Sequence, residues 1–586
     1  MNRQSQWLVI AGIALVLMGL LLPRDWYDAL PKFENQPPLL VKGVTLLQIT
    51  LVMEGVALAW FATRFRGFAR LQPGERLPHA AGTNDRVSAT AARWLLGAIV
   101  FVALVLRLLR LDADLWLDEI TPILSYGEMP LVPVVTSYIG SNNHLLNTLL
   151  LKLSLALFGP HEWAVRLPAA LFGVLTIPAM YWVSRLAMSR AGSLCAALLL
   201  AVSYHHVFFS QNARGYAAYL LFSLLASGCL VKALQEDRAR YWVLYVAAMF
   251  LDFASLLTSG FVFAAHIVVG AVALAVVRRG GFSPLPLARR LAAVFSVTAA
   301  LVLTLYVTIL PQLYAYTKTV YSDPATGFSP LAAEFWTDIA RGLSAGLGPA
   351  VLIAAIPLVL IGTVGFAALL RRQWALVLAL LLPGILTACL LVAQGLSFSP
   401  RFFLLMLLLG IGVVVQGIFS ASSAIAARFA PGRPAIAPRV ATALVLAGSA
   451  ISIISLKHYY AIPKQPYRAS LEFVATQREA GEPVIAIHLM EKGYQFYGPA
   501  FGMVEGVDWH AVRSLAAFDA ALAAHPGRSS LLVTTFPRAL RIGQPDLFAR
   551  VTEGAREMKT FPATIGDGAI TVWRYPSPPA KTLPAR

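Results

Sequence analysis

The sequence predicts an all-α polytopic membrane protein that carries a small α/β domain at its C-terminus. The composition supports this class, because 58% of the 586 residues are hydrophobic and only 13% are charged, with a mean hydropathy of +0.69. A soluble protein holds about a quarter charged residues. In addition, apolar runs of 17 to 23 residues recur along the chain. Each run is long enough to cross a hydrocarbon core about 30 Å thick.

The net charge of +18 does not indicate a nucleic-acid partner. Nucleic-acid-binding proteins show Lys/Arg-rich blocks with interleaved aromatic residues, and the chain has no such block. In a polytopic membrane protein, basic residues instead gather in cytoplasmic loops beside the bilayer. The lipid bilayer is therefore the partner that the charge pattern indicates.

We expect thirteen apolar runs to span the membrane, while one further run is expected to lie along its surface. The further run, 143–159, carries Asn143, His144, Asn147 and Lys152, which suits an interfacial amphipathic helix. With that run left out, every short Arg-rich loop faces one side, which is the cytoplasm by the positive-inside rule. The expected spans are 7–23, 43–63, 92–109, 166–184, 193–209, 216–234, 241–257, 260–277, 290–312, 348–370, 374–394, 402–419 and 439–456.

This topology divides the chain into three parts. Residues 1–91 form two N-terminal spans and a basic cytoplasmic loop, and residues 92–456 form a core with a long outer loop at 110–165. From 457 to 586 the composition turns mixed and polar, and strand-like runs (VIAIHLM, SLLVTTF, AITVWRY) alternate with amphipathic stretches such as VRSLAAFDAALAAH. This last part is predicted to be a small α/β domain outside the cell membrane.

Asp118 and Glu119 stand side by side in the outer loop. Two interpretations of this pair are open. Acidic residues in the first turn of a helix interact favourably with the helix dipole. Alternatively, ionisable groups beside the membrane are functional candidates, and a carboxylate there suits acid–base chemistry. Adjacent helical residues point about 100° apart, so only one of the two would face a site.

The outer loops also supply cations and hydrogen-bonding groups. Arg214, Arg401 and Lys152 are predicted to meet an anionic leaving group, with lipid headgroup anchoring as the alternative. The candidates for substrate contact are His144, Gln211, Tyr216 and Tyr316, from the outer segments 110–165, 210–216 and 313–347. The Asp-Ala-Asp motif at 112–114 leaves a divalent metal open as a cofactor, although a single such motif is weak evidence.

Several motifs, taken in order, resemble the GT-C membrane glycosyltransferases. The closest resemblance is to the bacterial glycosyltransferase family 39 group, which is related to the protein O-mannosyltransferases and the lipid A aminoarabinose transferase. The resemblance covers most of residues 92–470. It rests on LRLDADLWLDEI, NNHLLNTLLLKLSLALFG, HEWAVRLPAALFGVLTIPAMYWVSRLA, SYHHVFFSQNARGYAAYLLF, SPRFF and KQPYRASLEFV.

This resemblance implies a polyprenyl-phosphate sugar donor, a lipid or glycan acceptor and inversion at the anomeric carbon. It implies that Asp118 is the general base, that Glu119 orients it or helps to bind substrate, and that Arg214 or Arg401 meets the donor phosphate. The expected location is the bacterial inner membrane, with the active site on the periplasmic side.

The chain also departs from the family pattern. The two prolines that many members have after the residue equivalent to His144 are absent, and LLTSGF at 256–261 stands where relatives often show Thr-His-Tyr. A transporter or flippase of a lipid-linked substrate is the rival interpretation. Transporters often show internal repeats and Gly/Pro-broken spans near the midplane. We find no repeat, and the polar groups gather at the outer loops.

Overall fold

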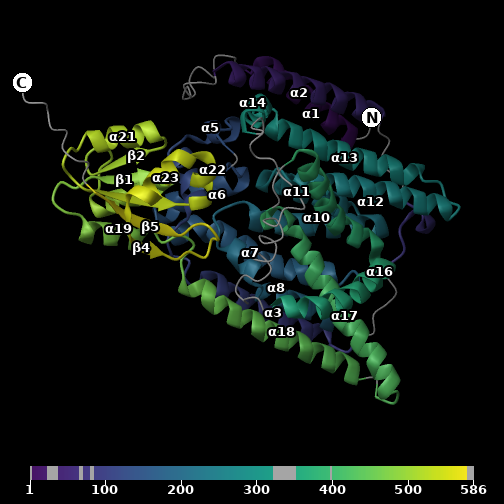
Figure 1. Cartoon of the computed structure of the whole chain (residues 1–586). Coiled ribbons are helices and arrows are strands. Elements are labelled where there is room, and N and C mark those ends of the chain that lie inside the picture. The colour runs from purple at the N-terminus through teal and green to yellow at the C-terminus, as the bar shows by residue number, and fades with distance from the viewer. Residues whose placement is uncertain are drawn as a thin grey trace, which may run out of the picture. The chain divides into compact units, whose positions relative to one another are not determined.

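The computed structural model describes residues 3–22, 37–64, 70–79, 85–140, 142–320, 351–395, 399–433 and 435–576 (Figure 1). The chain forms two compact units. The helical unit comprises Met1–Leu108, Met129–Ser154 and Arg166–Ser455, and the sheet unit comprises Leu109–Glu128, Leu155–Val165 and Leu456–Arg586.

Long apolar helices dominate the first part of the chain. Nine helices in the described residues are long and apolar enough to cross a membrane, or ten if the bent pair α8 and α9 forms one span. The chain is therefore a multi-pass membrane protein. The helices are α1 Arg3–Leu21, α2 Pro37–Arg64, α3 Ala89–Leu108, α4 Leu117–Tyr126, α5 Leu131–Thr136, α6 Leu145–Phe158, α7 Glu162–Ser184, α8 Arg190–Ala201, α9 Tyr204–Ser210, α10 Tyr216–Glu236, α11 Ala239–Ser255, α12 Ser259–Arg279, α13 Leu285–Tyr306, α14 Leu310–Val320, α16 Val351–Ala393, α17 Leu405–Phe429 and α18 Ile436–Ala461.

The expected thirteen spans and the observed helices differ in length and continuity. Two expected spans correspond to short helices, the apolar part of α1 at Ser5–Leu21 and the 17-residue α11. A third expected span, 193–209, is bent by 60° between α8 and α9. The expected spans 348–370 and 374–394 form the merged helix α16, whose backbone leaves helical geometry at Gln373 (φ −151°, ψ 64°). The count of thirteen stays a prediction.

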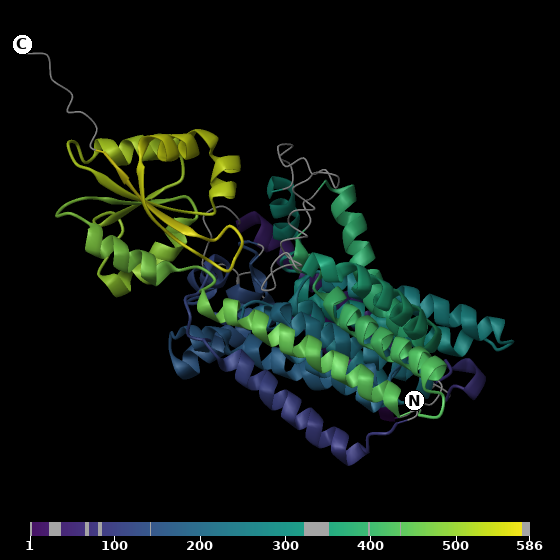
Figure 2. The ribbon, with the colours of Figure 1, turned by 60° about the horizontal axis from the view of Figure 1, so that its bottom comes forward.

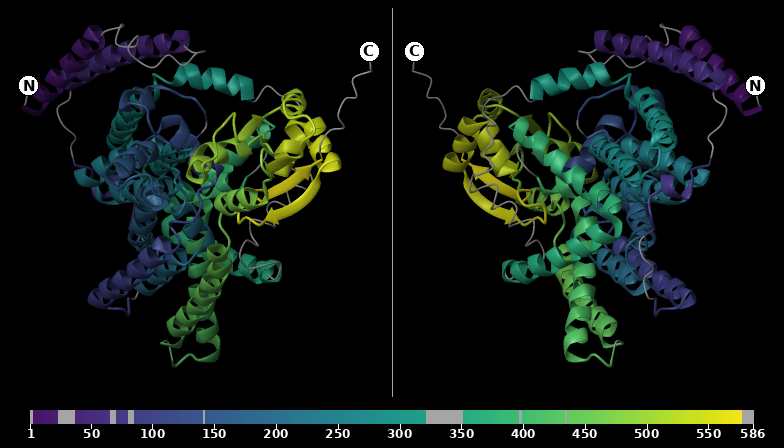
Figure 3. Two further views of the ribbon diagram at one scale, coloured as in Figure 1. Left: turned by 90° about the vertical axis from the view of Figure 1, so that its left-hand side faces the viewer. Right: turned by 90° about the vertical axis from the view of Figure 1, so that its right-hand side faces the viewer.

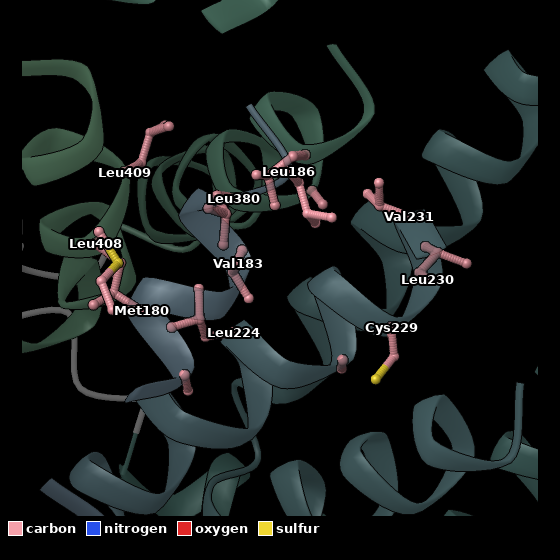
Figure 4. Packing of buried hydrophobic residues seen from close by; sticks show 14 of the residues in the cluster. Met180, Val183, Leu186, Leu224, Cys229, Leu230, Val231, Leu380, Leu408 and Leu409 are labelled. Carbon is pink, nitrogen blue, oxygen red and sulfur yellow. The ribbon is translucent and has the colours of Figure 1, made fainter. Parts of the chain in front are cut away.

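Helix α10 lies at the centre of the helical unit. Its most apolar window is 83% buried, more than that of the other candidate spans in the described part of the chain. Figure 4 shows Leu224 of α10 near buried side chains of α7, α16 and α17. The residues that precede α10 are thereby fixed to the most deeply packed helix of the unit.

The two N-terminal helices form an antiparallel pair, drawn in purple in Figure 3. Gly12 of α1 and Gly55 of α2 meet so closely that a Cβ on Gly12 would lie 2.6 Å from the Gly55 carbonyl oxygen. Small residues at such crossings let helix backbones approach in a membrane. Glu54 of α2 accepts a hydrogen bond of 2.8 Å from the Thr304 hydroxyl of α13, so the pair is attached to the rest of the unit.

The sheet unit contains a five-stranded mixed sheet in the order β2-β1-β3-β5-β4. The inner pairs β1–β2 and β1–β3 are parallel, and β5 is antiparallel to both β3 and β4. Helices lie on both faces of the sheet (Figure 2). The elements are α19 Tyr467–Gln477, β1 Val484–Ile487, α20 Met490–Tyr497, β2 Trp509–Val512, α21 Leu515–Ala523, β3 Ser530–Thr535, α22 Pro537–Gly543, α23 Pro545–Gly554, β4 Arg556–Phe561 and β5 Ile570–Tyr575.

Strands β1 and β3 are buried along their whole length, as is typical of strands covered on both faces. This small sheet domain confirms the predicted C-terminal change of architecture. The unit also includes Leu109–Glu128 and Leu155–Val165, which the sequence-based division placed with the helical core as part of the outer loop. They belong to the sheet unit because Arg468, at the start of α19, forms ion pairs with Asp114 and Glu162. A domain that begins at residue 457, as predicted, does not include these two earlier segments.

Candidate active site

The two adjacent acids lie in the first turn of α4, within the sheet unit. Trp116 is the N-cap residue, Asp118 is the second helical residue and Glu119 the third. Oε2 of Glu119 accepts a hydrogen bond of 3.2 Å from the Trp116 backbone N–H. A carboxylate at the third position that binds the N-cap N–H is half of a capping box. The structural capping role is therefore assigned to Glu119.

Glu119 is fully buried and forms an ion pair with a second buried residue. Nζ of Lys464 lies 3.6 Å from Oε1 of Glu119, and the Lys464 side chain is only 4% exposed. The next residue, Gln465, accepts a hydrogen bond of 3.0 Å from the Leu117 backbone N–H through its Oε1. The first turn of α4 is thus attached to the residues that lead into α19.

Asp118 is half-buried and lies near the hydroxyl of Tyr467. Burial raises the pKa of this hydroxyl well above its usual range, and the charges of Asp118 and Asp114 raise it further. The Tyr467 side chain is fully buried, and its oxygen makes no hydrogen bond within the described residues. Asp118 therefore has a protonated phenol in its electrostatic environment.

The Asp-Ala-Asp motif is engaged by a cation of the protein. Oδ2 of Asp114 accepts a hydrogen bond of 2.9 Å from the Arg468 backbone N–H, and its Oδ1 lies 3.5 Å from Nη1 of Arg468. The other acid, Asp112, is exposed. Within the described residues, no group of three or more His, Cys, Asp or Glu side chains is arranged to hold a metal ion. Asp114 therefore acts in an ion pair with Arg468.

A second group of candidate residues gathers in the helical unit, just before α10. Nε of Arg214 donates to Nε2 of His144 over 3.0 Å, and Nη2 of Arg214 donates to Oδ1 of Asn142 over 2.8 Å. Cζ of Arg214 lies 5.2 Å from the centre of the Tyr216 ring, a cation–π distance. The guanidinium, itself nearly fully buried, is thus oriented on three sides.

The electrostatics keep His144 neutral. Burial lowers the pKa of His144 well below its usual range, and the charge of Arg214 lowers it further. The charge of Arg401 also lowers the pKa of His144, whereas a hydrogen bond to the Ser255 backbone raises it. The neutral ring accepts from Arg214 at Nε2 and so orients its guanidinium. The predicted substrate contact of His144 stays a prediction.

The backbone of this turn is set by close packing at Gly215. A Cβ on Gly215 would lie 2.0 Å from the Ser255 carbonyl oxygen and 3.1 Å from Cβ of His144. Nδ2 of Asn147 donates a hydrogen bond of 2.8 Å to the Ala213 carbonyl, which ties α6 to the same turn. The segments 142–148 and 210–216, far apart in the sequence, therefore form one structure.

Replacing Gly215 by alanine should lower the stability of the protein by about 1–3 kcal/mol, the usual cost of overpacking. The φ of Gly215 is −66°, so the cost comes from the collision with the Ser255 backbone and not from the conformation. Thermal unfolding of the purified protein measures the change. Gly97→Ala in α3 is the matched control, because a Cβ there has nothing within 4 Å. Equal melting temperatures for the two variants would contradict the packing argument.

The remaining predicted residues are dispersed. Gln211 donates a hydrogen bond of 2.9 Å to the Arg107 carbonyl in the last turn of α3, which is a structural contact. Tyr316 of α14 packs edge-to-face against Tyr138 with ring centres 5.4 Å apart. Lys152 is half-buried in α6, and Arg401 is exposed in the short 3₁₀ helix Pro400–Phe403. Parts of two predicted outer segments, 321–347 and 397–398, lie outside the described residues.

The structure brings His144, Arg214 and Tyr216 together and places the charge of Arg401 near them. It also reveals residues that the sequence argument did not single out, namely Asn142, Lys464, Gln465, Tyr467 and Arg468. A signal for the last four was present. The motif KQPYR follows the last span and places two cations and an amide beside a loop that is rich in acids.

Part of the chain is similar to a known protein family. Residues 145–309 match the family model of dolichyl-phosphate-mannose-protein mannosyltransferases. This segment contains Lys152, Gln211, Arg214 and Tyr216, whereas Asp118 lies outside it. A comparison with curated proteins gave no match.

The solved structures that resemble the chain are remote in sequence. Apo ArnT from Cupriavidus metallidurans is 14% identical, with a TM-score of 0.45, over 83% of this chain and 98% of that one. The same protein bound to undecaprenyl phosphate has a TM-score of 0.42 at the same identity and coverage. The oligosaccharyltransferase AglB from Archaeoglobus fulgidus, in complex with an inhibitory peptide and a dolichol-phosphate, is 13% identical, with a TM-score of 0.46, over 80% of this chain and 73% of that one.

The family match confirms the resemblance drawn from the motifs. Over residues 145–309 the chain is similar to the dolichyl-phosphate-mannose-protein mannosyltransferase family, and it is a multi-pass membrane glycosyltransferase of the class that uses polyprenyl-phosphate sugar donors.

Proposed function

We propose that the protein is an inverting glycosyltransferase that moves a sugar from a polyprenyl phosphate to a hydroxyl group of a cell-envelope acceptor. The reaction takes place at the periplasmic face of the bacterial inner membrane. The topology inferred from the Arg-rich loops supports this placement, because it puts Asp118, Arg214 and Arg401 on the outer side. The acceptor is a lipid or a glycan.

The chemistry assigns one role to each group. The acceptor hydroxyl oxygen attacks the anomeric carbon from the side opposite the phosphate, and the carboxylate of Asp118 takes the hydroxyl proton as the new C–O bond forms. The bond between the anomeric carbon and the phosphate oxygen breaks, and its electron pair leaves with the polyprenyl phosphate. A positioned general base suits this step, because a neutral hydroxyl is a weak nucleophile.

The leaving phosphate gains negative charge as the bond breaks. Arg214 is suited to stabilise it, because a guanidinium binds phosphate oxygens through two parallel hydrogen bonds. Arg401 contributes a second positive charge near His144. Lys152 remains a candidate for a longer-range contribution from α6.

The observation that carries this proposal is the way Arg214 is held. Its hydrogen bonds to His144 and Asn142, together with the Tyr216 ring beside it, orient the guanidinium. Preorganised positive charge at the place where an anion develops is the usual source of a large share of catalysis. A headgroup anchor would not need an orienting histidine or the tight turn at Gly215.

Transfer of a labelled sugar by the purified full-length protein tests the proposal. The protein in lipid nanodiscs is supplied with undecaprenyl phosphate carrying a radiolabelled hexose, pentose or amino sugar, together with an envelope extract as acceptor. We expect the label to move to the acceptor with inverted anomeric configuration, while undecaprenyl phosphate is released. Movement of the intact donor across a vesicle membrane, with its sugar–phosphate bond uncleaved, would instead establish the transporter alternative and overturn the proposal.

A further inference from the structure

Within the sheet unit, the segment with the paired acids is attached to the residues after Leu456 at four separate points. Lys464 forms the buried ion pair with Glu119, and Gln465 accepts the hydrogen bond from the Leu117 N–H. Arg468 binds Asp114 through its backbone N–H and its guanidinium. In addition, the Leu115 N–H donates a hydrogen bond of 2.7 Å to the Tyr497 hydroxyl.

Three of these four contacts converge on one short stretch of chain. Lys464, Gln465 and Arg468 lie within five consecutive residues, and their partners lie within the six residues 114–119. Gln465 is itself fully buried and fixed from behind, because its Nε2 donates a hydrogen bond of 2.8 Å to the Thr535 hydroxyl at the end of β3. The central sheet is therefore linked, through one side chain, to the N-terminal turn that carries Asp118.

We propose that Lys464, Gln465 and Arg468 are positioning residues that hold the first turn of α4 and so fix the direction of the Asp118 carboxylate. This inference rests on the proposed role of Asp118 as the base. The sheet unit is then part of the catalytic machinery and not a separate acceptor-binding module. Misplacement of a catalytic group by about 1 Å can cost about 10²-fold in rate.

Lys464→Met tests the strongest of these contacts. The methionine fills a similar volume but removes the ammonium group from Glu119, so the turn should loosen. We expect kcat with the labelled donor to fall by about 10²-fold, with the donor KM unchanged. Hydrogen exchange of the Leu115 and Leu117 amides, which are bonded to Tyr497 and Gln465, should become faster.

The double variant Lys464→Met/Glu119→Gln separates positioning from a general loss of folding. The glutamine introduced in place of Glu119 carries no charge and retains an oxygen that can accept from the Trp116 N–H, so the turn should be held again. We expect the double variant to turn over at least about tenfold faster than Lys464→Met alone, a coupling within the range for contacting residues. Lys492→Met is the matched control, since Lys492 pairs over 3.9 Å with Glu491 of its own helix and not with a residue of 114–119. Its kcat should equal that of the wild type.

The outcomes distinguish this inference from the proposed function. Wild-type kcat and amide exchange in Lys464→Met would overturn the positioning role, as would a double variant no faster than the single one. Near-normal turnover in Asp118→Asn would overturn the role of Asp118 itself and the inference with it. A loss of turnover in Asp118→Asn with normal turnover in Lys464→Met overturns the positioning role alone.

Discussion

Replacing Asp118 by asparagine is expected to lower turnover by about 10²- to 10⁴-fold, the usual contribution of a general base. Asparagine keeps the size and hydrogen-bonding reach of the side chain but cannot take the acceptor proton. Binding of undecaprenyl phosphate to the same preparation should stay at its wild-type value, because the substitution leaves the groups around Arg214 intact. Transfer of the labelled sugar and binding of the carrier, measured side by side, give the two readings.

The structure sharpens this test because it separates the two acids. Glu119 performs the capping contact with the Trp116 N–H, so the position of Asp118 is not explained by capping. If Asp118 served only the helix dipole, asparagine would cost about 0.3–1 kcal/mol of stability and leave turnover per folded molecule unchanged. Turnover near the wild-type level in a folded Asp118→Asn protein would therefore refute the role of Asp118 as the general base.

Glu119→Gln serves as the neighbouring comparison. Glutamine retains an oxygen that can accept from both Trp116 and Lys464, although the ion pair with Lys464 is lost. We expect a smaller loss of turnover than in Asp118→Asn, accompanied by a lower melting temperature. An equal or larger loss from Glu119→Gln would indicate that the two acids have exchanged roles.

The spans and the inner strands could be predicted from the sequence because both are properties of single segments. The length of an apolar run by itself indicates whether the run can cross a bilayer. Strands β1, β3 and β5 each lie within a predicted strand-like run. Strands β2 and β4 escaped prediction because they are the two edges of the sheet. An edge strand is covered less, and the β4 sequence REMKTF is largely exposed, so it carries no apolar run.

The candidate site could be predicted only in part, for a related reason. The acids and the arginines were visible as costly charges beside apolar runs. Their partners were not visible, because the contact between Leu117 and Gln465 joins residues 348 positions apart, and that between Arg214 and His144 joins residues 70 apart. Hydrophobic patterning specifies which side of a segment is buried, but it does not specify which distant side chain pairs with a buried charge.

Arg214→Ala is expected to weaken binding of undecaprenyl phosphate by about 10- to 10²-fold. Hydrogen bonds to charged groups contribute about 1.5–3 kcal/mol, and about 1.4 kcal/mol corresponds to a factor of ten. The melting temperature is measured in parallel, because the variant also removes the partner of the buried His144 side chain and of the half-buried Asn142 side chain. Arg401→Ala should have a smaller effect, since Arg401 is exposed and solvent screens its charge.

The chain offers a matched control for this arginine. Arg240 also lies over a tyrosine ring, with its Cζ 4.6 Å from the centre of Tyr241, but it stands in the first turn of α11, at an end predicted to face the cytoplasm. Arg240→Ala therefore removes the same charge and a similar cation–π contact, and it should leave carrier binding unchanged.

Arg214→Lys is the informative intermediate, because lysine retains the charge but lacks the planar fork that binds His144 and Asn142 together. If charge alone held the phosphate, Arg214→Lys would bind like the wild type. If Arg214 and Arg401 instead anchored the protein to lipid headgroups, neither alanine variant would change the affinity for the carrier. Both variants would then lower the yield of protein in the membrane.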